Sequence, residues 1–400
     1  MRKAGRDRVP VEIRGSARLP LGMAPARFLR DYWQKRPLLV RNAFTGFVPP
    51  LSANDLAGLA CTDGALSRIV LHDPPRDKWT LRTGPFSESD FSSLPESHWT
   101  LLVQDVDKWD GDVAALLAHF DFLPDWRLDD VMVSYATDGG GVGAHVDQYD
   151  VFLLQGVGQR HWRIGTDPRA PHGFRDDVEL KLLREFRPTR EWTLDPGDML
   201  YLPPGVPHEG VAIGECMTFS IGMRAPSSAE LLVAFAEQIA AGLPESRRYA
   251  DPDLEPAREP GEIDDNALHR ARTALGPAAQ MMDAEAFADF FGRFITAYRS
   301  AGTPASRKRQ TSAEKLAAEL LRSTFVREPW SRFAFRRRGR SAVLYASGEQ
   351  YACPLAWARA LCGGGRTLDG ARLAKLPSRR AGVELLRDLI DAGDLSRKRR

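Results

Sequence analysis

A histidine and an aspartate stand two residues apart in the segment GGGVGAHVDQYD and could bind one ligand together. Alternate side chains of an extended strand share a face, so His145 and Asp147 would point the same way. A histidine from another strand would complete the two-histidine, one-carboxylate set that leaves coordination positions open on Fe(II). Among the other histidines we select His208, because it follows a proline- and glycine-rich strand and turn, Pro196 to Pro207. The spacing predicts a metal site made of these three side chains, whereas an HxD pair alone would be ordinary polar surface.

The glycines before this pair could instead form a phosphate-binding loop. Such a loop leads directly into a helix and is often followed by lysine and serine or threonine. Gly139 to Gly143 leads through Ala144 into the histidine, with no lysine and no helical pattern. We therefore reject the phosphate-binding interpretation and expect these glycines to allow a tight approach of the backbone to crowded neighbours.

An inward-pointing arginine is expected beside the metal site. The run from Val151 to Ile164 is predicted to be two strands around a turn at Gly156–Gly158, with Arg160 and Trp162 on one face. A guanidinium on an apolar face needs an anion. That anion is either a dicarboxylate cosubstrate that also chelates the metal or a carboxylate of the protein itself. We favour the dicarboxylate because the metal motif lies beside the arginine.

Short strands with proline and glycine turns between them run through the first 225 residues, which indicates an antiparallel sandwich or barrel. The expected helices lie at Ala26–Gln34, after Ser52 and at Val113–Phe120. The expected strands are Pro37–Arg41, Trp99–Gln104, Asp130–Ala136, Trp192–Leu194, Asp198–Leu202, Glu209–Ile213 and Met217–Met223.

The pattern becomes helical from Ala229 onward, and an amphipathic helical block of this kind can be a packing collar or a surface for self-association. Helices are expected near Ile263–Leu275 and Asp283–Tyr298. After residue 303 small helices alternate with strands, as in a winged-helix module. The strands are expected at Ser331–Arg337, Ala342–Ala346 and Glu349–Cys353, and the helices at Leu355–Leu361 and Gly382–Ala392.

The amino-acid composition limits the class of protein and its cellular compartment. The chain is 43% hydrophobic, with nine Trp and nineteen Phe, so packed cores are expected and global disorder is not. Four scattered cysteines without a CxxC pair favour a reducing compartment and argue against a disulfide framework or a zinc ribbon. No apolar leader and no membrane-length apolar run is visible, so we expect a cytoplasmic protein without a membrane partner.

Charge is distributed unevenly along the chain. The last hundred residues hold 22 Lys and Arg against 9 Asp and Glu, although the whole chain carries only +2. An acidic body suits a basic partner, and a basic end suits nucleic acid. A nucleic-acid-binding regulator that uses Arg336–Arg338 and Arg397–Arg400 is therefore one alternative function. Two solvated surfaces without a partner explain the same charges.

Several segments together resemble the JmjC/cupin-type 2-oxoglutarate oxygenases, and most closely the bacterial ribosomal oxygenases, which are arginine hydroxylases of a large-subunit ribosomal protein. The matching segments are DWRLDDVMVSYA, GGGVGAHVDQYDVFLLQG, LYLPPGVPHEG, IGMRAP and, near the N-terminus, YWQKRPLLVRNAF. The resemblance implies an α+β chain with an N-terminal double-stranded β-helix (JmjC/cupin jelly roll). That catalytic domain would span 1–225, a helical dimerisation region 226–303 and a C-terminal winged-helix-like module 304–400.

The resemblance also implies roles for individual residues. His145, Asp147 and His208 would bind Fe(II), Arg160 would bind the far carboxylate of 2-oxoglutarate, and Ser134 would offer it a hydroxyl group. O2 would be the second cosubstrate. The implied partners are a basic ribosomal protein as substrate, a second copy of the chain and ribosomal RNA at the basic C-terminal domain.

An arginine substrate needs carboxylate or aromatic groups in the pocket. Asp138, Tyr149 and Asp150 lie beside the metal motif and are the candidates. The same chemistry on a histidine of a ribosomal protein stays open. So does a metal-binding cupin without oxygenase activity, although such a protein has no use for the arginine as a dicarboxylate anchor.

Overall fold

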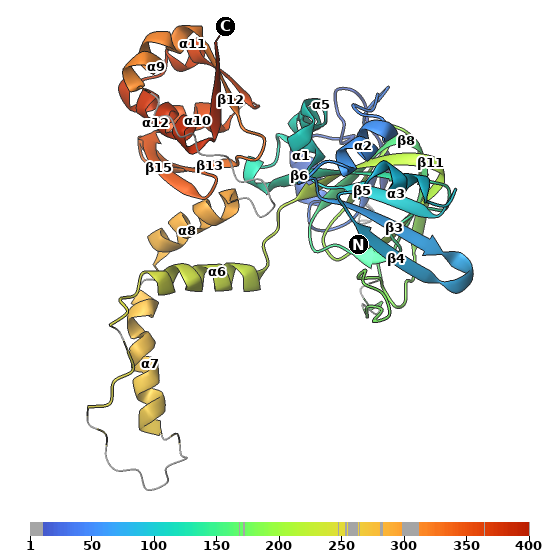
Figure 1. Ribbon diagram of the computed structural model, residues 1–400, viewed down its shortest axis with the longest axis horizontal. Helices are drawn as coiled ribbons and strands as arrows, with labels where there is room; N and C mark the ends of the chain where they lie inside the picture. Colours follow the sequence, from blue (N-terminus) through green and yellow to red (C-terminus); the bar gives the residue numbers. More distant parts are fainter. Residues whose placement is uncertain are drawn as a thin grey trace, which may run out of the picture. The chain divides into compact units, whose positions relative to one another are not determined.

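The chain divides into two compact units, Met1–Ala225 and Pro226–Arg400 (Figure 1). The computed structural model describes residues 11–167, 169–170, 173–246, 248–252, 254, 263, 265–280, 283–297, 312–363 and 365–399. The predicted boundary at residues 303 and 304 lies outside the described residues. The separation of a helical region from a C-terminal module therefore stays a prediction.

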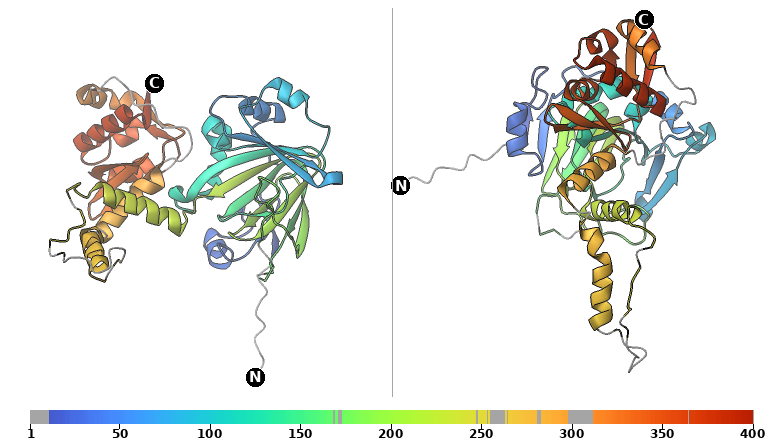
Figure 2. Two further views of the ribbon diagram at one scale, coloured as in Figure 1. Left: turned by 60° about the horizontal axis from the view of Figure 1, so that its bottom comes forward. Right: turned by 90° about the vertical axis from the view of Figure 1, so that its left-hand side faces the viewer.

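The strands of the first unit form one continuous sheet, and Figure 2 shows them curling into a barrel-like arrangement. The strand β7 (His145–Val146) pairs with β11, and β9 (Arg190–Leu194) pairs with β8. The other strands follow the order β1 (Glu12–Arg14), β2 (Leu38–Arg41), β10 (Met199–Leu202), β8 (Val151–Ile164), β11 (Pro207–Met223), β6 (Leu128–Ala136), β5 (Trp99–Val103), β3 (Ser67–Asp73) and β4 (Lys78–Thr83).

The two long strands β8 and β11 connect the two layers of the barrel. The first residues of β8 pair with β10, and its last residues pair with β9. The register between β8 and β11 shifts between Ile213 and Met217, opposite Gly158, which has a φ of +60°. A Cβ at Gly158 would lie 2.0 Å from the carbonyl oxygen of Glu215, so only glycine fits.

This bulge corrects two expectations. The predicted turn at Gly156–Gly158 is wrong, because the chain bends there within the single strand β8 instead of reversing. The predicted strands Glu209–Ile213 and Met217–Met223 are likewise parts of one strand, β11.

Helices of the first unit pack on the sheet through a large apolar core, to which Phe28, Tyr32, Leu56 and Phe120 belong. The predicted helix after Ser52 is α2 (Ala53–Ala60), and the Ser52 side chain caps it by accepting a hydrogen bond from the backbone N–H of Asp55. The remaining helices are α1 (Pro25–Asp31), α3 (Glu88–Ser92), α4 (Val106–Trp109) and α5 (Gly111–Ala115), with 3₁₀ segments at Pro74–Arg76, Leu116–Phe120 and Asp125–Arg127.

A second, smaller core lies on the other face of the strands. Its buried side chains come from β2, β8, β9 and β10 and include Leu39, Leu153, Trp162 and Leu200. Trp162 follows Arg160 on the same face of β8, as the sequence predicts. This face positions the candidate site.

The second unit combines helices with two three-stranded sheets. One sheet has the order β16 (Thr367–Asp369), β12 (Ser323–Arg327), β17 (Leu395–Arg399) and the other the order β13 (Phe333–Arg338), β14 (Ser341–Ala346), β15 (Glu349–Pro354). Its helices are α6 (Ser228–Ala241), α7 (Asp265–Gln280), α8 (Ala284–Thr296), α9 (Ala313–Glu319), α10 (Leu355–Cys362), α11 (Gly370–Leu373) and α12 (Arg379–Ala392), with a 3₁₀ turn at Leu320–Arg322.

The core of this unit is built around Trp357 of α10, which is fully buried. The Trp357 indole N–H donates to the Pro377 carbonyl at 2.8 Å, and α12 passes so close that a Cβ at Gly382 would lie 1.8 Å from the ring. The helix α8 packs on β13, β14 and β15. Among the described residues no helix is long and apolar enough to cross a membrane.

Candidate metal centre

The three predicted metal ligands meet in the structure. His145 lies on β7, Asp147 follows two residues later, and His208 lies on β11 directly opposite His145. One ligand atom from each of the three lies within 4.8 Å of the others. The Asp147 carboxylate is 3.9 Å from Nε2 of His145 and 3.6 Å from Nε2 of His208. Two imidazole nitrogens and one carboxylate oxygen at these separations fit a single metal ion.

Backbone carbonyls fix the orientation of both imidazoles. The Nδ1 atom of His145 is 2.9 Å from the carbonyl oxygen of Gly143, and Nδ1 of His208 is 2.9 Å from that of Val206. A neutral ring that donates through Nδ1 keeps its Nε2 lone pair free for a metal. Both Nε2 atoms lie near the Asp147 carboxylate. The backbone contacts at Nδ1 therefore orient the two rings as metal binding through Nε2 requires.

Burial sets the charge states at this cluster. Removal from water, together with the neighbouring His145, lowers the pKa of His208 to about 3, so its imidazole is neutral at physiological pH. Removal from water also raises the pKa of Asp147, an effect that His145 partly offsets. A metal cation would supply the positive charge that this carboxylate lacks in a dry environment.

The glycine run before His145 lets three backbone segments meet, as the sequence predicts. A Cβ at Gly140 would lie 2.3 Å from the carbonyl oxygen of Trp99, and one at Gly141 would lie 2.6 Å from that of Gly210. The run therefore brings the metal-site strand against both β5 and β11.

Arg160 is buried, with 5% of its surface exposed, on the inner face of β8. Among the described residues its Nε and Nη2 atoms have no hydrogen-bond partner. Its guanidinium carbon lies 5.8 Å from the centre of the Trp162 ring, and that ring lies 6.0 Å from the ring of His208. A buried guanidinium with two unused donors, one aromatic ring away from the metal ligands, needs an anion here. An internal salt bridge, the alternative left open by the sequence, is not found among the described residues.

Ser134 is also buried in this unit. It lies on β6 opposite Thr218 of β11, whose hydroxyl donates to the Gln155 side chain at 3.1 Å. Ser134 shares its strand face with Met132 and Asp130, because alternate residues point the same way.

Asp130 is a candidate functional residue that the sequence prediction missed. Removal from water and three neighbouring carboxylates, first Asp105, raise its pKa to about 7, although its carboxylate accepts a hydrogen bond from the Asp105 backbone N–H at 3.1 Å. The predicted substrate residue Tyr149 lies close by, hydrogen-bonded to Asp147, and its pKa is raised by burial and by the carboxylates of Asp147 and Asp130. The ionised form of such a carboxylate would be stabilised by a bound cation.

The other two predicted substrate residues lie elsewhere. The exposed Asp138 accepts a hydrogen bond from the backbone N–H of Gly214, six residues beyond His208 on β11, which is roughly 20 Å of extended chain. Asp150 is fully buried behind the sheet, where it accepts hydrogen bonds from Tyr201, at 2.6 Å, and from Gln34 and Arg127. Both aspartates thus accept hydrogen bonds within the protein, and their contact with a substrate stays a prediction.

Comparisons with known proteins match this architecture. Residues 115–231 match the family of the JmjC domain, and residues 279–396 match the family of the ROXA-like winged helix. The chain is 40% identical to the ribosomal protein uL16 3-hydroxylase of Escherichia coli over 276 residues, 68% of this chain and 71% of that protein. It is 38% identical to a probable ribosomal oxygenase of Haemophilus influenzae over 237 residues, 59% of this chain and 56% of that protein.

Solved structures show the same similarity over nearly the whole chain. The crystal structure of the E. coli ribosomal oxygenase YcfD has a TM-score of 0.76 at 33% identity and covers 94% of this chain and 98% of that one. A structure of YcfD in complex with cobalt and 2-oxoglutarate matches equally well, at 32% identity. The predicted α+β fold, a JmjC jelly roll followed by helices and a winged helix, is confirmed. The chain belongs to the ribosomal oxygenase family of JmjC-domain proteins.

Proposed function

We propose that this protein is an Fe(II)- and 2-oxoglutarate-dependent oxygenase that hydroxylates an arginine side chain of a large-subunit ribosomal protein. The single observation that carries this proposal is the ligand cluster His145, Asp147 and His208 beside the buried Arg160, whose Nε and Nη2 have no hydrogen-bond partner among the described residues. The names of the relatives support a ribosomal protein as substrate, and that of the E. coli relative points to uL16.

Each part of the site has a role in this proposal. The two Nε2 atoms and the Asp147 carboxylate would hold Fe(II), and the free N–H groups of Arg160 would donate to the far carboxylate of 2-oxoglutarate, with Ser134 as a further hydroxyl donor. The bound metal supplies the oxidation of an unactivated C–H bond by O2, with succinate and CO2 as co-products. The apolar side chains around Trp162 exclude water from this chemistry. No protein group is required as a general base.

Asp130 favours arginine over histidine as the target. An ionised carboxylate surrounded by other carboxylates is stabilised by a permanent cation, and a guanidinium is always charged. A neutral imidazole would not stabilise the ionised form of this carboxylate in that way. Tyr149 offers an aromatic ring and a hydroxyl to the same side chain.

Mass spectrometry of the substrate tests the proposal. Incubation of the full chain with Fe(II), 2-oxoglutarate and uL16 is expected to add one oxygen atom to an arginine. Asp130→Asn should raise KM for uL16 by about tenfold or more, because a charge-assisted contact is worth roughly 1.5–3 kcal/mol. The matched variant Asp138→Asn should leave KM unchanged. A hydroxylated histidine would contradict the arginine assignment, and absence of both oxidised uL16 and succinate would contradict the oxygenase.

A cupin that binds metal without oxygenase activity is the remaining alternative. Such a protein would not need a buried guanidinium with two free donors. If the chain binds Fe(II) but never consumes 2-oxoglutarate, this alternative replaces the proposal.

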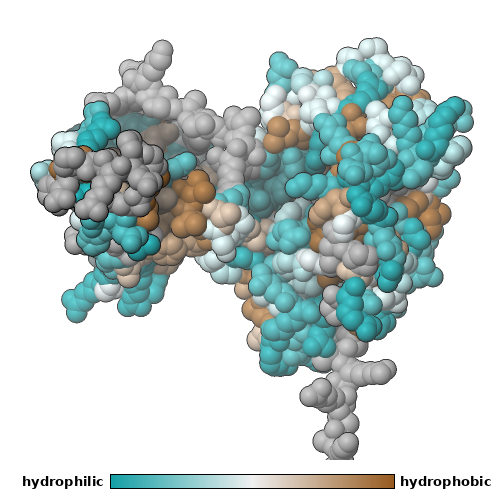
Figure 3. All heavy atoms as spheres, turned by 90° about the horizontal axis from the view of Figure 1, so that it is seen from below, coloured by the Kyte–Doolittle hydropathy of each residue, from teal (hydrophilic) through white to brown (hydrophobic). Residues whose placement is uncertain are grey.

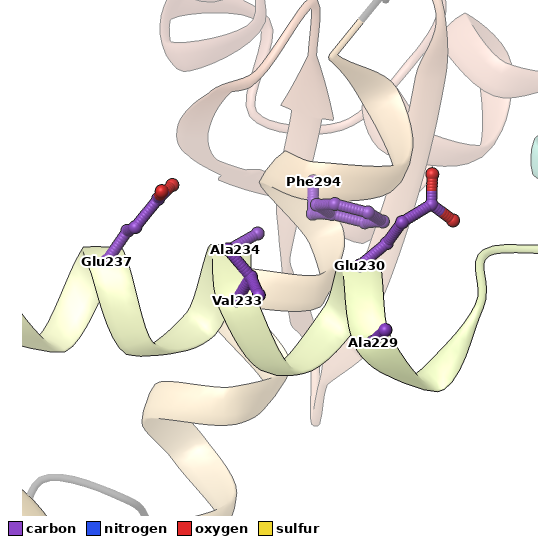
Figure 4. A pocket seen from close by; sticks show the side chains of 6 residues that line it. All are labelled: Ala229, Glu230, Val233, Ala234, Glu237 and Phe294. Atoms are coloured by element: carbon purple, nitrogen blue, oxygen red, sulfur yellow. The ribbon is translucent and has the colours of Figure 1, made fainter.

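We also propose that the chain forms a homodimer through its helical region. An open groove of about 530 Å³ lies between α6 and α8, lined by Ala229, Glu230, Val233, Ala234, Glu237 and Phe294 (Figure 4). Figure 3 shows apolar surface on this unit. The large apolar side chains exposed on α6, α7 and α8 are Leu232, Val233, Leu268, Leu275 and Phe287. Apolar surface of this kind is typical of an association site.

The mass of the protein in solution tests the dimer. Val233→Asp places a charge in the groove and is expected to convert a dimer to a monomer in light scattering. Val48→Asp is the control, because Val48 is also exposed but lies in the first unit. A monomeric wild type, or a dimer that survives Val233→Asp, would contradict the proposal.

A further inference from the structure

The described part of the second unit carries a basic surface that the oxygenase chemistry does not use. Arg322, Arg372, Lys375 and Arg379 are all exposed, and none of them forms an ion pair with a described carboxylate. We name these four side chains the basic patch. Arg336 and Arg338 of this unit, by contrast, pair with Glu285 of α8.

The fold brings the four elements of the basic patch together. Helix α11, which carries Arg372, packs on the 3₁₀ turn that ends in Arg322, so closely that a Cβ at Gly370 would lie 2.1 Å from the Leu320 carbonyl oxygen. Lys375 lies in the turn between α11 and α12. Arg379 begins α12 and donates to the carbonyl oxygen of Ala317 in α9 at 2.9 Å.

Helix stability does not explain these charges. Arg379 lies in the first turn of α12, where the helix dipole disfavours a cation. Farther along α12 the charges are balanced, because Arg380 pairs with Glu384 and Arg387 pairs with Asp388. The body of α12 therefore lacks the cationic face of a helix that reads bases in a nucleic-acid groove. The positive charge is concentrated at the turn before this helix.

We propose that the basic patch binds the phosphate backbone of ribosomal RNA. Four unpaired cations on adjoining turns match a polyanion with closely spaced charges, and a balanced helix body matches backbone contact without base reading. The charge arrangement indicates a nucleic-acid backbone as the ligand. The choice of ribosomal RNA as that nucleic acid rests on the proposed function. The patch would hold the enzyme near a substrate protein that is surrounded by RNA.

The test compares two double variants of the full chain that remove the same charge. Arg372→Gln with Lys375→Gln alters the basic patch, whereas Arg337→Gln with Arg340→Gln alters exposed arginines of the β13–β14 hairpin. Fluorescence anisotropy of a labelled RNA hairpin is measured over a range of salt concentrations. The patch variant is expected to bind about tenfold more weakly and to lower the salt slope by roughly 1.5, while the hairpin variant matches wild type.

Three outcomes would overturn the proposal. The first is a wild-type titration that leaves the anisotropy unchanged, and the second is an equal loss of affinity in both variants. The third is full displacement of the RNA by polyglutamate at the same charge concentration, which would indicate an acidic protein partner. Hydroxylation of isolated uL16 by the patch variant is measured in parallel. That activity should be unchanged, so failure of RNA binding and failure of the oxygenase are distinguished.

Discussion

At the scale of single residues, the site consists of polar groups whose burial makes sense only with ligands. In the part of the chain that the structure describes, two buried donors of Arg160 have no acceptor, and Asp130 is a carboxylate among carboxylates. Both arrangements cost free energy in the unliganded protein. A dianionic cosubstrate and a cationic substrate would relieve them, so each residue gives a separate prediction.

Replacing Arg160 with leucine should raise KM for 2-oxoglutarate by about 30-fold, which corresponds to roughly 2 kcal/mol for a charge-assisted hydrogen bond. The melting temperature of the unliganded protein should not fall, because an unpaired buried charge is removed. Arg163→Leu is the control on the same strand, since Arg163 pairs with Glu209. An unchanged KM for Arg160→Leu would show that the guanidinium does not bind the cosubstrate.

Asp130 should make the stability of the protein depend on pH. Its pKa is raised from 3.8 to about 7 by removal from water and by Asp105, Asp129 and Asp107, and Tyr149 also faces it. The folded state therefore holds a proton that the unfolded state has lost, so the free energy of unfolding should fall as pH rises from about 4 to about 7. Denaturant titrations of Asp130→Asn should show a flatter profile over that window. The same slope in both proteins would contradict the raised pKa.

Residues also show what the sequence could predict. His145 and Asp147 follow from the two-residue period of a strand, and Arg160 from its position two residues before Trp162 on the inner face. Asp130 shares the strand face of Ser134, but the sequence does not show which carboxylates the fold brings around it to raise its pKa. The sequence did not show the hydrogen bond that Asp150 accepts from Tyr201, because it depends on how the start of β8 packs.

At the scale of elements, a strand was predictable where its hydrophobic pattern is strong. β6 and β10 were found, whereas β3 and β4 were not predicted. Their hairpin contains many polar residues and is closed by a 3₁₀ turn, Pro74–Arg76, instead of a short Asn-Gly or Asp-Gly turn. The bend in β8 was mistaken for a turn because glycine is common in both. The close contact of Gly158 with the Glu215 carbonyl, which the sequence does not show, makes it a bulge within one strand.

The docking of α8 on its sheet gives a prediction at this scale. A Cβ at Gly292 would lie 2.4 Å from the Tyr345 ring, so Gly292→Ala should lower the free energy of unfolding by about 1–3 kcal/mol. Gly276→Ala is the matched helical control, because nothing lies within 4 Å of its Cβ position, and it should stabilise α7 by up to about 1 kcal/mol. Thermal unfolding of the full chain compares them. Equal melting temperatures would show that α8 does not pack closely on this sheet.

At the scale of the whole molecule, the chain joins a jelly roll that holds the candidate iron site to a basic winged helix. The order of these parts was predictable, because short strands give way to helical periodicity near residue 226, close to the end of the first unit at Ala225. The boundary near residue 303 was not tested, since it lies outside the described residues. The charge imbalance was visible in the sequence, but only the fold shows which cations are left unpaired.

The most direct test of the central claim uses mass spectrometry of uL16 after reaction in ¹⁸O₂. Wild type should transfer one heavy oxygen atom to an arginine for each succinate formed, whereas Asp147→Ala should lose turnover while keeping the wild-type melting profile without metal. Asp138→Ala should retain full turnover. Activity that survives Asp147→Ala, or uL16 without heavy oxygen when the wild type is loaded with iron, would contradict the account.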